Sequence, residues 1–202
     1  MSNPLARATY LTSVHQLRQL PADEGREVAF AGRSNAGKSS ALNALTGQGS
    51  LARVSKTPGR TQALNYFQVD AGRYLVDLPG YGYAKVPTAM RDAWGRVIDA
   101  YFRQRRSLAG LVVVMDIRHP LRDYDRQMLA YAAARALPAH CLLTKADKLG
   151  RGEQAKILAA VRRELGESAS AQVFSAQSKA GVEEARAVVL GWLDLADAGE
   201  AG

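Results

Sequence analysis

One eight-residue stretch of the sequence has the residue types of a phosphate-binding loop. Gly32-Arg33-Ser34-Asn35-Ala36-Gly37-Lys38-Ser39 follows an apolar run and opens a helical pattern, which is the context that the G-x-x-x-x-G-K-[ST] motif requires. Its glycines let backbone N–H groups wrap around a phosphate, and the helix N-terminus favours the negative charge. We expect this loop and Ser40 to bind nucleotide phosphates, with Lys38 as a catalytic charge and Ser39 as a ligand of Mg²⁺.

Two later segments could sense the outermost phosphate. Asp77-Leu78-Pro79-Gly80 ends a strand-like run. By itself this sequence is a common turn, but after a phosphate loop it predicts Asp77 near Mg²⁺, through water, and the Gly80 N–H as a catalytic donor. The loop before that strand can fold over the phosphate and offer Thr61 to Mg²⁺ as a catalytic ligand, with Thr57 as the competing candidate. The predicted nucleotide contacts are Gly59, Arg60, Thr61, Gln62, Ala63, Asp77, Leu78, Pro79 and Gly80.

A third group of residues could select the base. Thr144-Lys145-Ala146-Asp147 follows an apolar strand-like run. One carboxylate can accept both N1–H and N2–H₂ of guanine, whereas adenine has an acceptor at N1 and no 2-amino group. Asp147 therefore indicates guanine, with the stem of Lys145 along the base. Phe174-Ser175-Ala176 completes the predicted site because the Ala176 N–H can reach the guanine O6. An ATPase or a kinase would share the phosphate loop but not this set.

Two residues bear on the rate of GTP hydrolysis. A Ras-like enzyme places a glutamine after the second switch to orient the attacking water, but this chain has Tyr81 there. We therefore expect slow intrinsic turnover that a partner stimulates. Two roles are open for Asn35. Related GTPases with asparagine at this position hold K⁺ beside the phosphates, and asparagine also often serves only to fix a loop conformation.

The elements that must position these residues alternate between short apolar runs and longer amphipathic stretches. This rhythm predicts an α/β chain with a six-stranded, mainly parallel sheet that has helices on both faces. The short link Ala71-Gly72-Arg73 predicts one antiparallel edge strand. Together with the motifs above, we expect the P-loop NTPase (Ras-like GTPase) fold. We expect an N-terminal extension over 1–25, the GTPase domain over 26–198 and a disordered tail over 199–202. The predicted strands are Glu27–Ala31, Ala63–Asp70, Tyr74–Val76, Leu111–Met115, His140–Leu143 and Gln172–Phe174, and the predicted helices are Lys38–Thr46, Thr88–Arg106, Asp123–Ala136, Gly152–Leu165 and Val182–Ala196.

The charge of the chain points to an acidic partner. The net charge is +8, and residues 85–106 hold six basic residues against two acidic ones. We expect Trp94 and its helical neighbours to be core. Two interpretations stay open for the surrounding arginines, an RNA-facing surface and a solvated helix face. The basic residues concerned are Arg53, Lys56, Arg60, Arg91, Arg103, Arg105 and Arg106.

Composition also predicts the compartment. The longest apolar run, Leu108 to Met115, is too short to span a bilayer, and nothing near the N-terminus is typical of a signal peptide. The single cysteine, Cys141, lies in an apolar run and predicts a buried small hydrophobe in a reducing environment. We expect a cytoplasmic monomer without a membrane partner.

Several of these motifs together resemble one family. The runs Gly32–Ser40, Ser55–Gln62 and Asp77–Ala84, with Asp116-Ile117-Arg118-His119 and Thr144–Leu149, are similar to those of the EngB family of bacterial ribosome-assembly GTPases. The resemblance extends from about Glu27 to Trp192. Ala36 and Ala63 depart from it in size only.

The resemblance implies more than the motifs do. It implies a cytoplasmic GTPase that helps to mature the large ribosomal subunit, with rRNA as partner, Mg²⁺ at Ser39 and Thr61, and a link to cell division and septation. Two other functions stay open at this point, namely a GTP-sensing RNA scaffold with little hydrolysis and a GTPase of tRNA modification.

Overall fold

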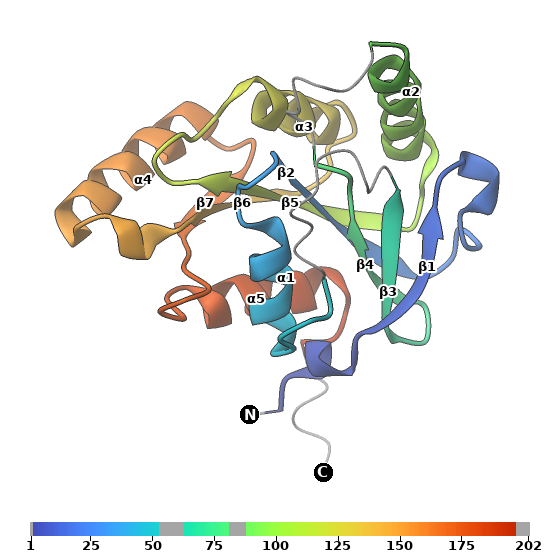
Figure 1. Cartoon of the computed structure of the whole chain (residues 1–202), viewed down its shortest axis with the longest axis horizontal. Coiled ribbons are helices and arrows are strands. Elements are labelled where there is room, and N and C mark those ends of the chain that lie inside the picture. Colours follow the sequence, from blue (N-terminus) through green and yellow to red (C-terminus); the bar gives the residue numbers. More distant parts are fainter. Residues whose placement is uncertain (1, 53–62, 81–87, 197–202) are drawn as a thin grey trace.

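The chain forms one sheet of seven strands in the computed structural model, which describes residues 2–52, 63–80 and 88–196 (Figure 1). The strand order is β1-β3-β4-β2-β5-β6-β7, and β3 runs antiparallel to both of its neighbours while the remaining pairs are parallel. The strands are β1 (Thr9–Val14), β2 (Arg26–Gly32), β3 (Leu64–Asp70), β4 (Arg73–Asp77), β5 (Leu108–Asp116), β6 (Ala139–Thr144) and β7 (Ser170–Val173).

Helices cover both faces of this sheet. Helices α1 and α5 pack on one face, below the sheet in Figure 1, and α2, α3 and α4 pack on the other. The helices are α1 (Lys38–Thr46), α2 (Thr88–Gln104), α3 (Asp123–Ala134), α4 (Arg151–Leu165) and α5 (Val182–Trp192), with short 3₁₀ helices η1 (Pro4–Arg7), η2 (Leu17–Gln19) and η3 (Ala146–Lys148). The predicted fold class is confirmed.

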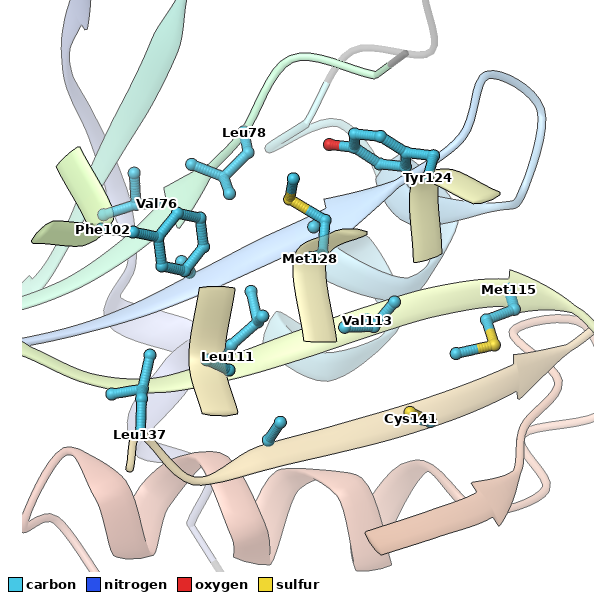
Figure 2. Close-up of a cluster of buried hydrophobic side chains, with 14 of the residues drawn as sticks. Val76, Leu78, Phe102, Leu111, Val113, Met115, Tyr124, Met128, Leu137 and Cys141 are labelled. Carbon is cyan, nitrogen blue, oxygen red and sulfur yellow. The ribbon is translucent and has the colours of Figure 1, made fainter. Parts of the chain in front are cut away.

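Alternate side chains of the central strands pack into two separate hydrophobic cores. In β5, Leu111, Val113 and Met115 face α2, α3 and α4, as Figure 2 shows, whereas Val112 and Val114 face α1 and α5. Strands buried on both faces carry continuous apolar runs, which is why these strands could be predicted from the sequence. Cys141 is fully buried among them, as predicted, and burial raises the pKa of its thiol to about 12.

The seventh strand, β1, is absent from the sequence prediction of six strands. It lies at the edge of the sheet, within the predicted N-terminal extension, and among the described strands it pairs with β3 alone. Tyr10 and Leu11 are exposed, and the pairing register shifts between Tyr10 and Thr12. An edge strand that buries little has no clear alternation of apolar and polar residues, so the sequence carries almost no signal for it.

No helix in the described part of the chain is long and apolar enough to cross a membrane.

A buried ion pair joins the end of α2 to the start of β2. Glu27 is completely buried, and its Oε1 accepts hydrogen bonds from Nε (2.8 Å) and Nη2 (2.5 Å) of Arg105. Its Oε2 accepts the hydroxyls of Tyr66 (3.1 Å) and Tyr101 (3.0 Å). Burial has the largest effect on the pKa of both phenols, and the Glu27 carboxylate has the next largest; both raise it. Both hydroxyls therefore stay protonated and donate to Glu27. Every oxygen of this buried carboxylate is therefore satisfied.

The position of Arg105 corrects one sequence interpretation. Arg105 was grouped with the arginines of a surface facing RNA or solvent, but it is buried and points into the protein. Helical spacing correctly predicted a core face, since Trp94, Ile98, Tyr101 and Phe102 are buried and Val97 is partly buried against the same core. The sequence could not reveal that Arg105 turns inward, because its partner Glu27 is 78 residues away in the chain.

We predict that Glu27→Gln destabilises the fold by about 3–5 kcal/mol, because it removes the nearest counter-ion of the buried Arg105 and leaves the more distant, partly exposed Asp23 at 3.7 Å. Urea denaturation followed by circular dichroism measures this. The matched control is Glu164→Gln, which breaks an exposed ion pair with Arg126 and should cost less than about 1 kcal/mol. Equal effects of the two variants would contradict the prediction.

Candidate nucleotide-binding site

The predicted site residues meet at one edge of the sheet. Strands β2, β4, β5 and β6 are parallel, so their carboxyl ends lie side by side, and ligands of open α/β sheets bind at this edge. The phosphate-loop sequence follows β2, and Asp77 ends β4. Asp116 ends β5, while Lys145 to Asp147 follow β6. Segments that are far apart in the sequence thus surround one candidate binding site at the carboxyl edge of the sheet.

The loop after β2 has the backbone of an anion cradle. Asn35 (φ 62°) and Gly37 (φ 91°) both adopt the left-handed conformation, and the Ala36 N–H donates to the Arg33 carbonyl at 3.0 Å. Successive N–H groups turned in this way form a concave site for an anion. Gly80 lies against the loop, since a Cβ there would sit 3.3 Å from the Gly32 carbonyl oxygen and 3.5 Å from the Ser34 nitrogen. A side chain at position 80 would therefore crowd the cradle.

Lys38 and Asp77 form an ion pair inside this cradle. The Lys38 ammonium contacts Asp77 Oδ1, and the two side chains are only 12% and 13% exposed. Nearby in the loop, Ser34 Oγ is buried and has no hydrogen-bond partner among the described residues. A buried hydroxyl without a partner is costly, so Ser34 is suited to meet a polar ligand.

Thr144 ties the cradle to the sheet. Its hydroxyl lies within hydrogen-bond distance of the Ala36 carbonyl in the loop and 2.9 Å from the Met115 carbonyl in β5. The residue is buried, and a Cβ at Gly37 would sit 3.4 Å from its Oγ1. The Thr144 hydroxyl at the end of β6 therefore helps to fix the position of the phosphate loop.

The loop after β6 presents a carboxylate held in its ionised form. Ser175 Oγ donates to Asp147 Oδ1 at 2.6 Å, and this hydrogen bond lowers the pKa of the Asp147 carboxyl below its ordinary value. Ser175 is itself fixed, because it is buried and its Oγ accepts the Ser178 N–H at 3.1 Å. The backbone of the next loop is also joined to this one, since the Ala146 N–H donates to the Phe174 carbonyl at 3.2 Å. Asp147 is thus a rigid anionic acceptor.

The structure brings most of the predicted site residues to this edge. Leu78, Ala63 and Phe174 are buried, so they support the site from the core. Several predictions fall outside the described residues, namely the contacts Gly59, Arg60, Thr61 and Gln62, the competing Thr57, and Tyr81, on which the expectation of slow turnover rests. The residues gathered around the edge are Gly32, Arg33, Ser34, Asn35, Ala36, Gly37, Lys38, Ser39, Ser40, Asp77, Pro79, Gly80, Thr144, Lys145, Ala146, Asp147, Ser175 and Ala176.

Sequence reasoning gave no role to two groups at this edge. Ser175 was predicted to be part of the site, but only the Ala176 N–H was given a contact, and Asp116 with Arg118 served only as part of a resemblance. Lys145 Nζ lies 3.1 Å from Asp116 Oδ2, which Arg118 also contacts at 2.7 Å. The sequence did carry a signal for Ser175 and Asp116, because each comes directly after a predicted strand, where side chains reach the ligand edge of the sheet.

Comparison with known proteins supports the nucleotide-binding site described above. Residues 27–145 match the family model of the 50S ribosome-binding GTPases. A relative from Stenotrophomonas maltophilia, "Probable GTP-binding protein EngB", is 65% identical over 96% of this chain and 100% of its own length. The chain belongs to the EngB family of GTP-binding proteins. A relative of the same name from Xylella fastidiosa is 64% identical, covering 97% of this chain and 98% of its own.

Solved structures agree with the fold of an EngB-family protein. A crystal structure of a probable GTP-binding protein EngB has a TM-score of 0.67 at 19% identity, covering 83% of this chain and 98% of its own. The structure of Era in complex with MgGDPNP and nucleotides of 16S ribosomal RNA has a TM-score of 0.62 at 18% identity, covering 84% and 57%. The GTPase fold and membership of a GTP-binding family are therefore established.

We predict that Thr144→Val loosens the phosphate loop and speeds the release of GDP. Valine keeps the shape but leaves the buried Ala36 and Met115 carbonyls without the hydroxyl, at a cost of about 1–3 kcal/mol. Stopped-flow fluorescence of a labelled GDP should show release faster by roughly tenfold. Thr144→Ser, which retains the hydroxyl, is the matched control and should release GDP at nearly the wild-type rate. Equal acceleration in both variants would contradict the prediction, because Thr144→Ser keeps the hydroxyl that Thr144→Val removes.

Proposed function

We propose that this EngB-family chain is a Mg²⁺-dependent GTP switch that hydrolyses GTP slowly and assists assembly of the large ribosomal subunit. The observation that supports it best is the pairing of two features at one sheet edge, the ionised Asp147 carboxylate held by Ser175 and the cradle around Lys38. The first suits a guanine base and the second suits its phosphates. We assign residues 26–198 to the GTPase domain, with β1 of the N-terminal extension added to its sheet.

The choice of guanine follows from the fixed charge of Asp147. A rigid carboxylate can accept N1–H and N2–H₂ together, whereas adenine would leave it desolvated and unpaired. Sites that bind a specific polar group reject analogues without it by about 10⁴ to 10⁵. The Lys145 side chain, which crosses to the Asn35 carbonyl at 2.6 Å, places its apolar stem beside the base.

The residues at the cradle fit a Mg²⁺ ion shared with phosphates. Mg²⁺ prefers oxygen ligands and usually keeps one or two protein ligands beside phosphates and waters, and the Ser39 hydroxyl and the Asp77 carboxylate are donors of this kind. Within residues 2–52, 63–80 and 88–196, no group of three His, Cys, Asp or Glu side chains could hold a metal alone. The ion would neutralise charge on the phosphates when bound. We propose Ser39, Asp77 (through water) and Thr61 as its ligands.

The residues of the cradle account for hydrolysis by positioning and charge. The Lys38 ammonium lies in the partly buried cradle, where it pairs with Asp77. It can exchange this partner for the outer phosphates of a nucleotide bound in the same cradle. The Gly80 N–H, close to the loop backbone, can donate to the outermost phosphate. The sequence has Tyr81 where a water-orienting glutamine would stand, so turnover should be slow and should rise with a ribosomal partner. The left-handed backbone of Asn35 favours the interpretation that this residue fixes the loop conformation. A comparison of hydrolysis rates in KCl and NaCl tests the other interpretation, that Asn35 holds K⁺.

A basic surface supports the ribosome as partner. Arg96, Arg103 and Arg106 are exposed on and just after α2, although Arg103 pairs with Asp99 and Arg106 with Asp23. The matching family is described as binding the 50S ribosome, and Era was solved with ribosomal RNA. Contacts with RNA phosphates would make binding fall with salt. A monomer in the cytoplasm with a role in cell division and septation completes the proposal.

We predict that the wild-type chain binds GTP and GDP in calorimetry but binds ATP at least about 10⁴-fold more weakly. Asp147→Asn replaces one acceptor oxygen by a donor and should remove most of the GTP affinity. The same variant should gain affinity for XTP, whose C2 carbonyl can accept from the new amide. Binding of ATP as tight as that of GTP, or of neither nucleotide, would overturn the proposed function.

We predict that large ribosomal subunits bind the GTP form in a salt-dependent manner and accelerate single-turnover hydrolysis. The double variant Arg103→Glu, Arg106→Glu should cosediment roughly tenfold less, because two phosphate-binding charges are reversed. Arg163→Glu, an exposed arginine on α4, is the control and should bind as wild type does. Nucleotide-dependent binding without any acceleration would instead favour a scaffold that senses GTP.

A further inference from the structure

Asp116 lies beside Lys145 because of the sheet register. Asp116 pairs with Thr144 in the parallel β5–β6 ladder, and the Ile117 N–H donates to the Thr144 carbonyl at 3.0 Å. The residue that follows β6 is Lys145, whose backbone is left-handed at φ 58°. A lysine in this conformation is uncommon and needs support from its surroundings. The end of β5 is therefore the neighbour best placed to provide that support.

The Lys145 ammonium has two partners that pull it across the phosphate loop. It donates to the Asn35 carbonyl at 2.6 Å and lies 3.1 Å from Asp116 Oδ2. The Asp116 side chain is only 13% exposed and that of Lys145 is 32% exposed, so water screens this ion pair less than one at the surface. The lysine thus joins the end of β5 to the loop that cradles phosphate.

Asp116 is itself held in place by Arg118. Its Oδ1 accepts the Arg118 backbone N–H at 3.0 Å and Nε at 2.9 Å, while its Oδ2 accepts Nη2 at 2.7 Å. Such a two-pronged contact fixes the plane of a carboxylate. Arg118, and then Lys145, holds the pKa of Asp116 well below its usual range, so the carboxylate stays charged. The oxygen that faces Lys145 therefore has a defined direction.

We propose that Asp116, oriented by Arg118, is a positioning residue that holds Lys145 across the phosphate loop and thereby slows release of the guanine nucleotide. This inference rests on the proposed function, since it requires that Lys145 lie along the base. Asp116 makes no contact with the nucleotide in this scheme. It acts only through Lys145, which distinguishes it from a residue that merely closes the turn after β5.

A double-mutant cycle tests this proposal. The rate of release of fluorescently labelled GDP is measured for wild type, Asp116→Asn, Lys145→Ala and the double variant. Asp116→Asn keeps the size and an acceptor oxygen but loses the charge, and it should speed release roughly tenfold. In the Lys145→Ala background the same change should speed release less than about twofold, because the group through which it acts is gone. Glu164→Gln, which breaks an exposed ion pair between α3 and α4, is the control and should release GDP at the wild-type rate.

A second variant keeps the test decisive if Asp116→Asn fails to fold by circular dichroism. Arg118→Lys retains the charge but loses the two-pronged contact, so it should speed release about threefold, and again only when Lys145 is present. Asp116→Asn without effect, or with its full effect in the Lys145→Ala background, would overturn the proposal. A wild-type chain that binds no GDP would instead refute the proposed function.

Discussion

The parallel register of β2, β5 and β6 is the constraint on which the rest of the structure depends. The register pairs Gly32 with Val114 and Asp116 with Thr144, so the ends of β5 and β6 lie level at one edge and β2 ends two residues before them. A slip of one residue would turn every side chain to the opposite face. Successive side chains of β5 pack into two different cores. A slip of one residue would exchange the side chains of the two cores, and their volumes would no longer fit against the helices.

Polar contacts at this edge convert a shared location into a defined geometry. Thr144 connects the phosphate loop to β5, Ser175 orients Asp147, and Asp116 directs Lys145. Each contact crosses between loops that are distant in sequence. The loops themselves contain left-handed residues that need such support. The site is therefore organised by side chains whose partners lie on neighbouring strands, and the stiffness of the sheet is passed to the loops.

The opposite end of the sheet carries a different kind of polar group. Glu27, near the start of β2, is buried with Arg105 and two tyrosine hydroxyls. This pair fixes the end of α2 against the strand that leads into the phosphate loop. Buried charges of this kind are tolerated only when every oxygen and N–H has a partner.

Much of this protein could be predicted from its sequence because the signals involved are local. The phosphate loop, Asp77 and Asp147 are identified by residue type and by their place after an apolar run, and the five helices by their spacing. The tertiary structure decided what depends on distant partners, as for β1, which buries too little to leave a pattern, and Arg105, which turns inward to a residue 78 positions away. The same holds for the roles of Ser175 and Asp116. Hydrogen bonds and ion pairs act only over a few ångströms, so which residues share one becomes known only when the chain has folded.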